Sequence, residues 1–276
     1  MFDAASEQTA TELYVDAHVH VYPCMSVAAV LDAAARNLLR GRPASPPPAG
    51  VLLVADPDGV PGYARLAGDA IGPRWQRVQA DGRVVSFLNE AGVVVAALPG
   101  RQLVSEEGLE VLGAGCGERV RSGRPLGELV ESIRAAGGLA LLAWGVGKWL
   151  GRRGRVLDRV IAEQAGRRDV MLADNAGRPG LWSHVPQFAA ATECGLRVLA
   201  GTDPLPFAGE ERRIGSYGFR VRVPTGPGDA PRALRRALET PEVPIEIVGR
   251  RVSARDFVAG QLKLRTMRMW RGGRRS

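Results

Sequence analysis

Cysteine and histidine are both scarce, with three of each in 276 residues. The cysteines stand far apart at Cys24, Cys116 and Cys194, which excludes the C-x-x-C spacing of zinc and thiol redox sites. A sparse, odd number of cysteines suits a reducing compartment, so we expect a cytoplasmic protein. A chain of this length can bury one core without disulfide or metal staples.

Long apolar runs are also missing. Runs such as 51–55 and 139–144 are far shorter than the roughly 20 residues that cross a bilayer. Residues 1–12 are polar and acidic, without the basic and then apolar segments of a signal peptide. The sequence therefore predicts no membrane partner.

Lysine occurs only at Lys148 and Lys263, so arginine carries nearly all the basic charge. The 37 basic and 29 acidic residues give a net charge of +8. Residues 263–276 hold six basic side chains and no acid, which leaves a net charge of +2 on the rest. We expect one domain over residues 10–262 and a basic, flexible tail over 263–276. Any binding of nucleic acid should be weak and run through this tail.

Strand-length apolar runs alternate with amphipathic stretches, a pattern typical of parallel α/β proteins. Period-3.6 stretches predict helices at 25–39, 62–71, 126–136, 155–165, 183–194, 231–238 and 254–267. Extended segments are predicted at 13–17, 51–56, 93–98, 109–113, 139–143, 169–173, 196–200 and 218–223, with a hairpin at 74–79 and 83–87. No repeat or composition break marks a second domain, so we expect a single barrel-like α/β unit.

Two histidines stand directly after the first predicted strand, in the segment Asp-Ala-His-Val-His at residues 16–20. Residues i and i+2 of an extended chain point the same way, so His18 and His20 can present two imidazoles to one metal ion. Asp203 follows a late strand and can be a third ligand or a base. The alternatives are two solvated loop histidines and an aspartate that caps a turn.

In this order of motifs the chain resembles the polymerase and histidinol phosphatase (PHP) superfamily of metal-dependent phosphoesterases, from about residue 14 to residue 219. The family opens with D-x-H-x-H, matched by residues 16–20. Its later motifs T-D-H-D, P-G-x-E, H-V-L-G, A-H-P and G-S-D-A-H correspond in order to residues 55–58, 99–102, 110–113, 143–145 and 201–205. The resemblance implies a distorted (β/α)7-type barrel with a metal site at one mouth.

The departures from the family pattern reduce the number of ligands. Pro57, Trp144 and Leu205 stand where the family has histidines, Glu110 replaces another, and Gln102 replaces a bridging glutamate. The remaining His18, His20 and Asp203 can hold one ion with an open position, but not a cluster of three. We therefore expect one divalent ion, zinc or manganese.

Further polar residues follow the predicted strands and should lie around the same mouth. Arginine and lysine there could receive an anion, and the amide and carboxylate could orient it. These expected substrate-binding residues are Arg101, Gln102, Lys148, Asp174, Asn175 and Arg178. The alternative is that they pair with Asp56, Asp58 and Asp174 to fill a site that has lost its metal.

Two functions remain open. The first is a PHP-like metal-dependent hydrolase, a phosphoesterase for a small anionic substrate, in which His18, His20 and Asp203 hold the metal and Asp203 also serves catalysis. The second is a degenerate PHP-like barrel kept as a binding or scaffolding module. The sequence leaves the oligomeric state undetermined.

Overall fold

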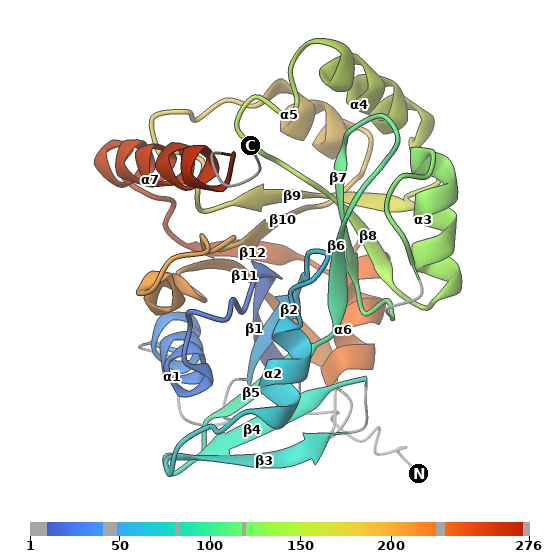
Figure 1. The fold of residues 1–276 in the computed structure, drawn as a ribbon. Coiled ribbons are helices and arrows are strands. Elements are labelled where there is room, and N and C mark those ends of the chain that lie inside the picture. Colours follow the sequence, from blue (N-terminus) through green and yellow to red (C-terminus); the bar gives the residue numbers. More distant parts are fainter. Residues whose placement is uncertain (1–9, 41–48, 81–82, 118–119, 225–229, 273–276) are drawn as a thin grey trace, which may run out of the picture.

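Two mixed β-sheets occupy the centre of the molecule (Figure 1). The structure is a computed structural model and describes residues 10–40, 49–80, 83–117, 120–224 and 230–272. Over these residues the chain forms strands β1 to β12 and helices α1 to α7. The sheets contain seven and five strands, and neither closes into a barrel.

The seven-stranded sheet has the order β12-β11-β1-β2-β5-β4-β3. Parallel pairing joins β1 to β2 and β2 to β5, and antiparallel strands extend both edges. Its strands in chain order are β1 (Ala10–Val19), β2 (Ala49–Val54), β3 (Trp75–Ala80), β4 (Val85–Asn89), β5 (Val94–Leu98), β11 (Tyr217–Pro224) and β12 (Ile245–Gly249).

The five-stranded sheet has the order β10-β9-β8-β7-β6. Its strands β8, β9 and β10 are parallel, whereas β6 and β7 form an antiparallel hairpin at one edge. The strands are β6 (Gly100–Val104), β7 (Glu110–Ala114), β8 (Leu139–Ala143), β9 (Val170–Asn175) and β10 (Val198–Gly201).

Helices cover the outer face of each sheet, and the inner faces share a core with α6 (Ala230–Glu239). Leu13, Leu53, Leu141, Leu199 and Phe219 of this core are each at most 2% exposed. The seven-stranded sheet packs outward on α1 (Val27–Leu38) and α2 (Gly62–Gly68). The five-stranded sheet packs outward on α3 (Leu126–Ala135), α4 (Gly151–Glu163) and α5 (Pro186–Glu193).

The predicted (β/α)7-type, TIM-like barrel is wrong, and the connections explain why. A barrel of this kind needs a helix between successive parallel strands. Here only Pro99 separates β5 from β6, and five or fewer residues separate β3 from β4, β4 from β5 and β6 from β7. Short turns permit antiparallel pairing, so these strands extend open sheet edges instead of closing a ring.

Gly100 marks the point where the chain passes from one sheet to the other. A Cβ atom there would lie 2.3 Å from the Val54 carbonyl oxygen and 2.7 Å from that of Gly113. Both distances are too short for any side chain. The close approach of three backbone segments therefore requires glycine at this position.

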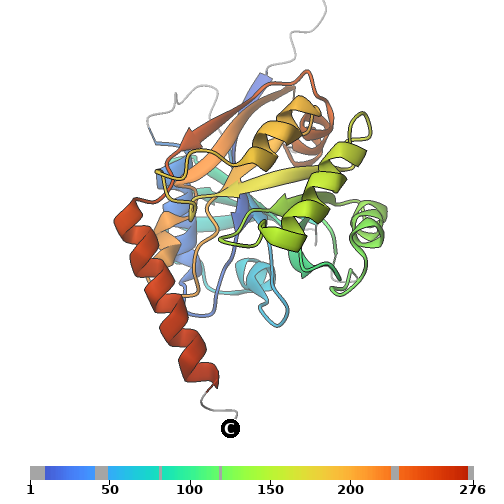
Figure 2. The same ribbon diagram turned by 90° about the horizontal axis from the view of Figure 1, so that it is seen from above.

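The last helix, α7 (Ala254–Gly272), stands apart from the sheets. It runs along one side of the molecule and extends beyond it at the C-terminal end (Figure 2). The boundary expected at residue 263 falls inside this helix. None of the described helices is long and apolar enough to span a membrane.

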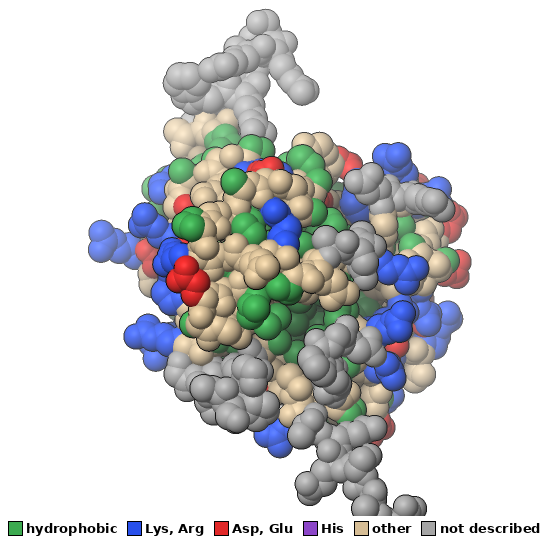
Figure 3. All heavy atoms as spheres, turned by 90° about the horizontal axis from the view of Figure 1, so that it is seen from below, with side chains coloured by type: hydrophobic (Ala, Val, Ile, Leu, Met, Phe, Trp, Pro, Cys, Tyr) green, Lys and Arg blue, Asp and Glu red, His purple; other side chains and the backbone are tan. Residues whose placement is uncertain are grey.

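Basic side chains are dispersed on the face of the molecule seen from below. Hydrophobic side chains gather near its centre, and basic and acidic ones both lie toward its rim (Figure 3). The basic side chains on this face therefore do not gather into a single patch.

Candidate metal centre

Two imidazoles and one carboxylate converge where β1 and β10 end. The Nε2 atoms of His18 and His20 lie 3.0 Å apart. The Oδ1 atom of Asp203 lies 3.6 Å from the first and 3.3 Å from the second. Both histidines are 2% exposed, and together the three residues form a group that could hold a metal ion.

Backbone contacts between the two strand ends fix this geometry. A Cβ atom at Gly201 would lie 2.4 Å from the backbone nitrogen of His18, so only glycine lets β10 come this close to β1. Two residues later, Asp203 adopts a left-handed backbone with φ of 49°, and its N–H donates to the His18 carbonyl at 2.8 Å. A strained backbone held by its surroundings is common at functional sites.

Asp16 also holds these two strand ends together through its hydrogen bonds. This role was not predicted from the sequence. Its Oδ1 accepts hydrogen bonds from the backbone N–H of Thr202 at 2.7 Å and of His18 at 3.2 Å. Its Oδ2 accepts from the Thr202 hydroxyl at 2.5 Å and from Gly215 N at 2.8 Å. Asp16 is fully buried, and burial raises its pKa to about 6. It therefore positions the ligand-bearing segments without being one of the converging groups.

The protonation states of His18 and Asp203 suit a cation. Burial lowers the pKa of His18 to about 4, so its ring is neutral near pH 7. Burial acts to raise the pKa of Asp203, but His18 and His20 outweigh this effect and hold it below its usual range. A neutral imidazole and an ionised carboxylate are the forms that bind metals.

The donor set fits one divalent ion. Zinc–nitrogen bonds are about 2.0–2.1 Å long, so two Nε2 atoms 3.0 Å apart can reach the same ion. Without a cation, this Nε2 to Nε2 contact is a hydrogen bond only where one nitrogen donates to the other. Three protein ligands also leave a position open, as in catalytic zinc sites. The fit does not distinguish zinc from manganese.

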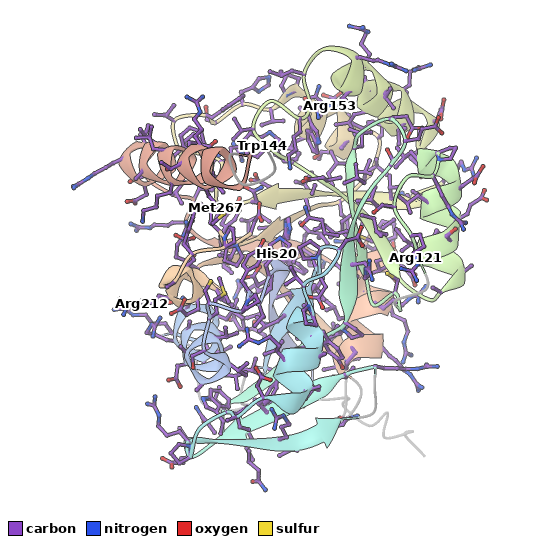
Figure 4. The ribbon with its side chains drawn as sticks, viewed as in Figure 1. His20, Arg121, Trp144, Arg153, Arg212 and Met267 are labelled. Carbon is purple, nitrogen blue, oxygen red and sulfur yellow. The ribbon has the colours of Figure 1, made fainter. Side chains whose placement is uncertain are left out.

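Two residues of the triad, His20 and Asp203, line a cavity of about 590 Å³. Pro57, Trp144 and Lys148 line the same cavity. Figure 4 shows His20 near the middle of the molecule, with Trp144 and Met267 around it in this view. The Tyr22 ring also lines the cavity, 5.3 Å from the His20 ring, and burial raises the pKa of its phenol, which therefore stays protonated.

Three of the expected substrate-binding residues line this cavity: Gln102, Lys148 and Asn175. Asn175 donates from Nδ2 to Asp203 Oδ2 at 3.0 Å and to the Trp144 carbonyl at 2.9 Å, so it orients the carboxylate. Gln102 has a buried Oε1 for which the described residues provide no donor.

Lys148 forms an ion pair with Glu110, the residue that opens β7. Both side chains line the cavity. The charge of Lys148 also acts on Asp203 and favours its ionised form. A protein cation thus lies beside the triad, held in place by a carboxylate.

The other three expected residues lie outside the cavity lining. Arg101, whose side chain is 15% exposed, pairs with the exposed Asp58. Asp174 accepts hydrogen bonds from Arg178 Nε at 2.7 Å and Nη2 at 2.5 Å, and from the Tyr217 hydroxyl at 2.8 Å. Asp174 and Arg178 are 4% and 5% exposed, so they form a buried internal pair.

One side of α7 also lines the cavity, through Phe257, Gly260, Gln261 and Leu264, which were not among the predicted site residues. Their spacing of three and four residues is a usable signal, because it places them on one helix face. No local sequence pattern indicates that this face lies at the same cavity as His20.

Among solved structures, the chain is similar to PsfC from Pseudomonas syringae PB-5123, with a TM-score of 0.58 and 15% sequence identity, over 94% of this chain and 99% of that chain. It also matches the lesion-specific endonuclease PfuEndoQ from Pyrococcus furiosus, with a TM-score of 0.46 and 13% identity, over 86% of this chain and 57% of that chain. No protein-family profile and no curated protein matches the chain.

These findings correct the family resemblance drawn from the motif order. The described strands form two open mixed sheets instead of a PHP barrel, and the short motifs that suggested the family are matched by no family profile. The similarity to PfuEndoQ is distant. The similarity to PsfC extends over nearly the whole of both chains but at low identity, and it shows the fold alone: an α/β protein with two open mixed sheets.

Proposed function

We propose that this protein is a metal-dependent hydrolase that cleaves a phosphate ester of a small anionic substrate with one divalent ion. The single observation that carries the proposal is the convergence of His18 Nε2, His20 Nε2 and Asp203 Oδ1 beside a cavity that His20 and Asp203 line. Two imidazoles and a carboxylate with an open position are the ligand set of many hydrolytic zinc sites.

Each residue has a role that follows from its contacts. His18, His20 and Asp203 hold the ion, which when bound supplies Lewis-acid chemistry and activates water at neutral pH. Asn175 orients Asp203 through the hydrogen bond to Oδ2. Lys148 offers the substrate anion a positive charge, and its pairing with Glu110 fixes the ammonium group beside the triad.

A second candidate is a binding module without catalysis. The observation that favours it is the Lys148–Glu110 ion pair, because it consumes a carboxylate beside the triad that could otherwise serve as a base or a further ligand. In that case the cavity would bind an anion, and no bond would be cleaved.

Metal analysis combined with an assay separates the two candidates. Protein purified without chelators is measured for metal and then assayed with p-nitrophenyl phosphate in added Zn²⁺ or Mn²⁺. We expect about one ion per chain and hydrolysis that stops when a chelator removes it. The His20→Ala variant should lose both, and the matched His184→Ala variant, changed at an exposed histidine, should keep both.

Metal binding without hydrolysis of this or other small phosphate esters would favour the binding module. Less than about 0.1 ion per chain, unchanged by added metal, would exclude the hydrolase.

A further inference from the structure

One side of α7 lines the cavity that also contains His20 and Asp203. Positions 257, 260, 261, 264 and 267 are half-buried, whereas the other described side chains of α7 are exposed. Four of them, Phe257, Gly260, Gln261 and Leu264, line the cavity that also contains His20 and Asp203. The helix thus turns a single stripe toward the candidate metal site.

The stripe differs from an ordinary packing face. No described side chain of α7 is fully buried, and the stripe mixes apolar residues with Gln261. A helix that only stabilised the core would bury a continuous apolar face. The helix starts at an N-cap, where Ser253 Oγ accepts from Asp256 N at 3.1 Å and donates to Asp256 Oδ2 at 2.7 Å. These hydrogen bonds define where the helix begins.

The cavity combines apolar surface with one uncommitted positive charge. Trp144, Leu205, Phe257 and Leu264 supply the apolar part. Of the basic side chains in the lining, Lys148 pairs with Glu110 and Arg213 pairs with Glu210 at 3.1 Å. Arg265 of α7 also lines the cavity, and the described residues place no carboxylate on it.

We propose that α7 is the specificity wall of this site and restricts it to a small molecule with an anionic group and an apolar group. Leu264 and Phe257 contact the apolar group, and Arg265 binds a negative charge that the triad and Lys148 do not. The volume of about 590 Å³ lies within the range of small-molecule sites. This assignment rests on the proposed function for the location of the reacting group, and its test does not require turnover.

Binding of phenylphosphonate, a phosphonate with an aromatic ring, tests the proposal. Titration calorimetry of the zinc-loaded protein measures the affinity. The Leu264→Trp variant fills the cavity. The control variant Leu262→Trp changes a neighbouring side chain that is 59% exposed. We expect Leu264→Trp and Arg265→Gln each to weaken binding about tenfold, because the first substitution overpacks the cavity and the second removes a charge-assisted hydrogen bond. Leu262→Trp and Arg255→Gln should leave the affinity unchanged.

Metal content and thermal unfolding, measured on all four variants, distinguish a local effect from misfolding. If Leu264→Trp unfolds, the milder Leu264→Ala should also weaken binding, because it removes the apolar contact. No binding of phenylphosphonate, equal affinities in all variants, or its displacement by a single-stranded 20-nucleotide DNA would overturn the assignment. Binding that depends on α7 in a protein that hydrolyses nothing would leave it standing and overturn the proposed hydrolase.

Discussion

Two buried polar clusters lie at the ends of the neighbouring strands β9 and β10, and they differ in how their hydrogen bonds are satisfied. In the cluster of Asp174, Arg178 and Tyr217, both carboxylate oxygens receive donors within 2.8 Å. In the cluster of His18, His20 and Asp203, two ring nitrogens and a carboxylate oxygen face one another, and the group opens into a cavity.

The difference separates a structural cluster from a candidate site. Buried polar groups are stable when they are paired with one another, as in the first cluster. In the second cluster, hydrogen-bond acceptors converge on one point. Such a buried group is stable only when a cation or a proton lies between the acceptors. Burial of polar residues alone therefore does not identify a candidate metal site. The useful sign is that the lone pairs of several acceptors point toward one position.

Removing a ligand should have the largest effect. We expect His18→Ala and His20→Ala to weaken zinc binding by more than about 100-fold, because substitutions of residues that merely support ligands already cost about 10–100-fold. Competition with a chromophoric chelator measures the affinity, and circular dichroism verifies the fold. Wild-type affinity in both variants would place the metal elsewhere or nowhere.

Breaking the other cluster should affect stability and not metal binding. Arg178→Met leaves the carboxylate of Asp174 buried and without its two guanidinium donors. The free energy of unfolding should fall by about 3–5 kcal/mol, the usual cost of removing one partner of a buried ion pair. Denaturant titration measures this change. A loss of zinc affinity at unchanged stability would mean that the two clusters are one functional unit.

Asp16 holds the strand ends that carry the triad, so its substitution tests whether positioning of the ligands affects metal binding. Asp16→Asn replaces an acceptor of backbone and hydroxyl hydrogens with a side chain that is half donor, so the contacts to Thr202 and Gly215 become strained. We expect zinc affinity to fall about 10–100-fold, with both histidines still present. Asp58→Asn, at a surface carboxylate that is 69% exposed, is the matched control and should bind zinc normally.

Asp56 is an intermediate case and should give the smallest effect. Its Oδ2 accepts from Tyr63 N at the start of α2 at 2.9 Å, whereas its buried Oδ1 has no partner among the described residues. Burial raises the pKa of Asp56 from its usual 3.8 to about 6.

Between these two values the folded state keeps a proton that the unfolded chain releases, so the contribution of Asp56 to stability falls as the pH rises from 4 to above 6. Asp56→Asn should remove this part of the pH dependence, and denaturant titrations at pH 4.5 and 7 measure it. Parallel stability curves for the wild type and the variant would show that Asp56 has an ordinary pKa in the folded protein.

Local structure could be predicted well from the sequence, because apolar periodicity dominates it. The predicted helix at 126–136 is α3, and the predicted strand at 139–143 is β8. β6 and β12 were missed. Ile245–Gly249 is a half-exposed edge strand, and the buried Leu103 is the only strong signal in Gly100–Val104. Edge strands bury little surface and leave a weak pattern.

The architecture could not be predicted from alternation, because alternating strands and helices fit both open sheets and barrels. The candidate site was easier to predict than the architecture. The H-x-H spacing and the position of Asp203 after a strand predicted the triad that the structure brings together. The pairing of Arg178 with Asp174 and the role of α7 depend on long-range packing, which no local pattern encodes.

Anomalous X-ray diffraction from crystals soaked in Zn²⁺ tests the central claim most directly, because it locates the ion independently of activity. The account predicts one strong peak within about 2.0–2.2 Å of His18 Nε2, His20 Nε2 and an oxygen of Asp203, with a non-protein ligand on the side of the cavity. Ordered density for the three side chains with their Nε2 atoms in direct contact and no peak between them would contradict it.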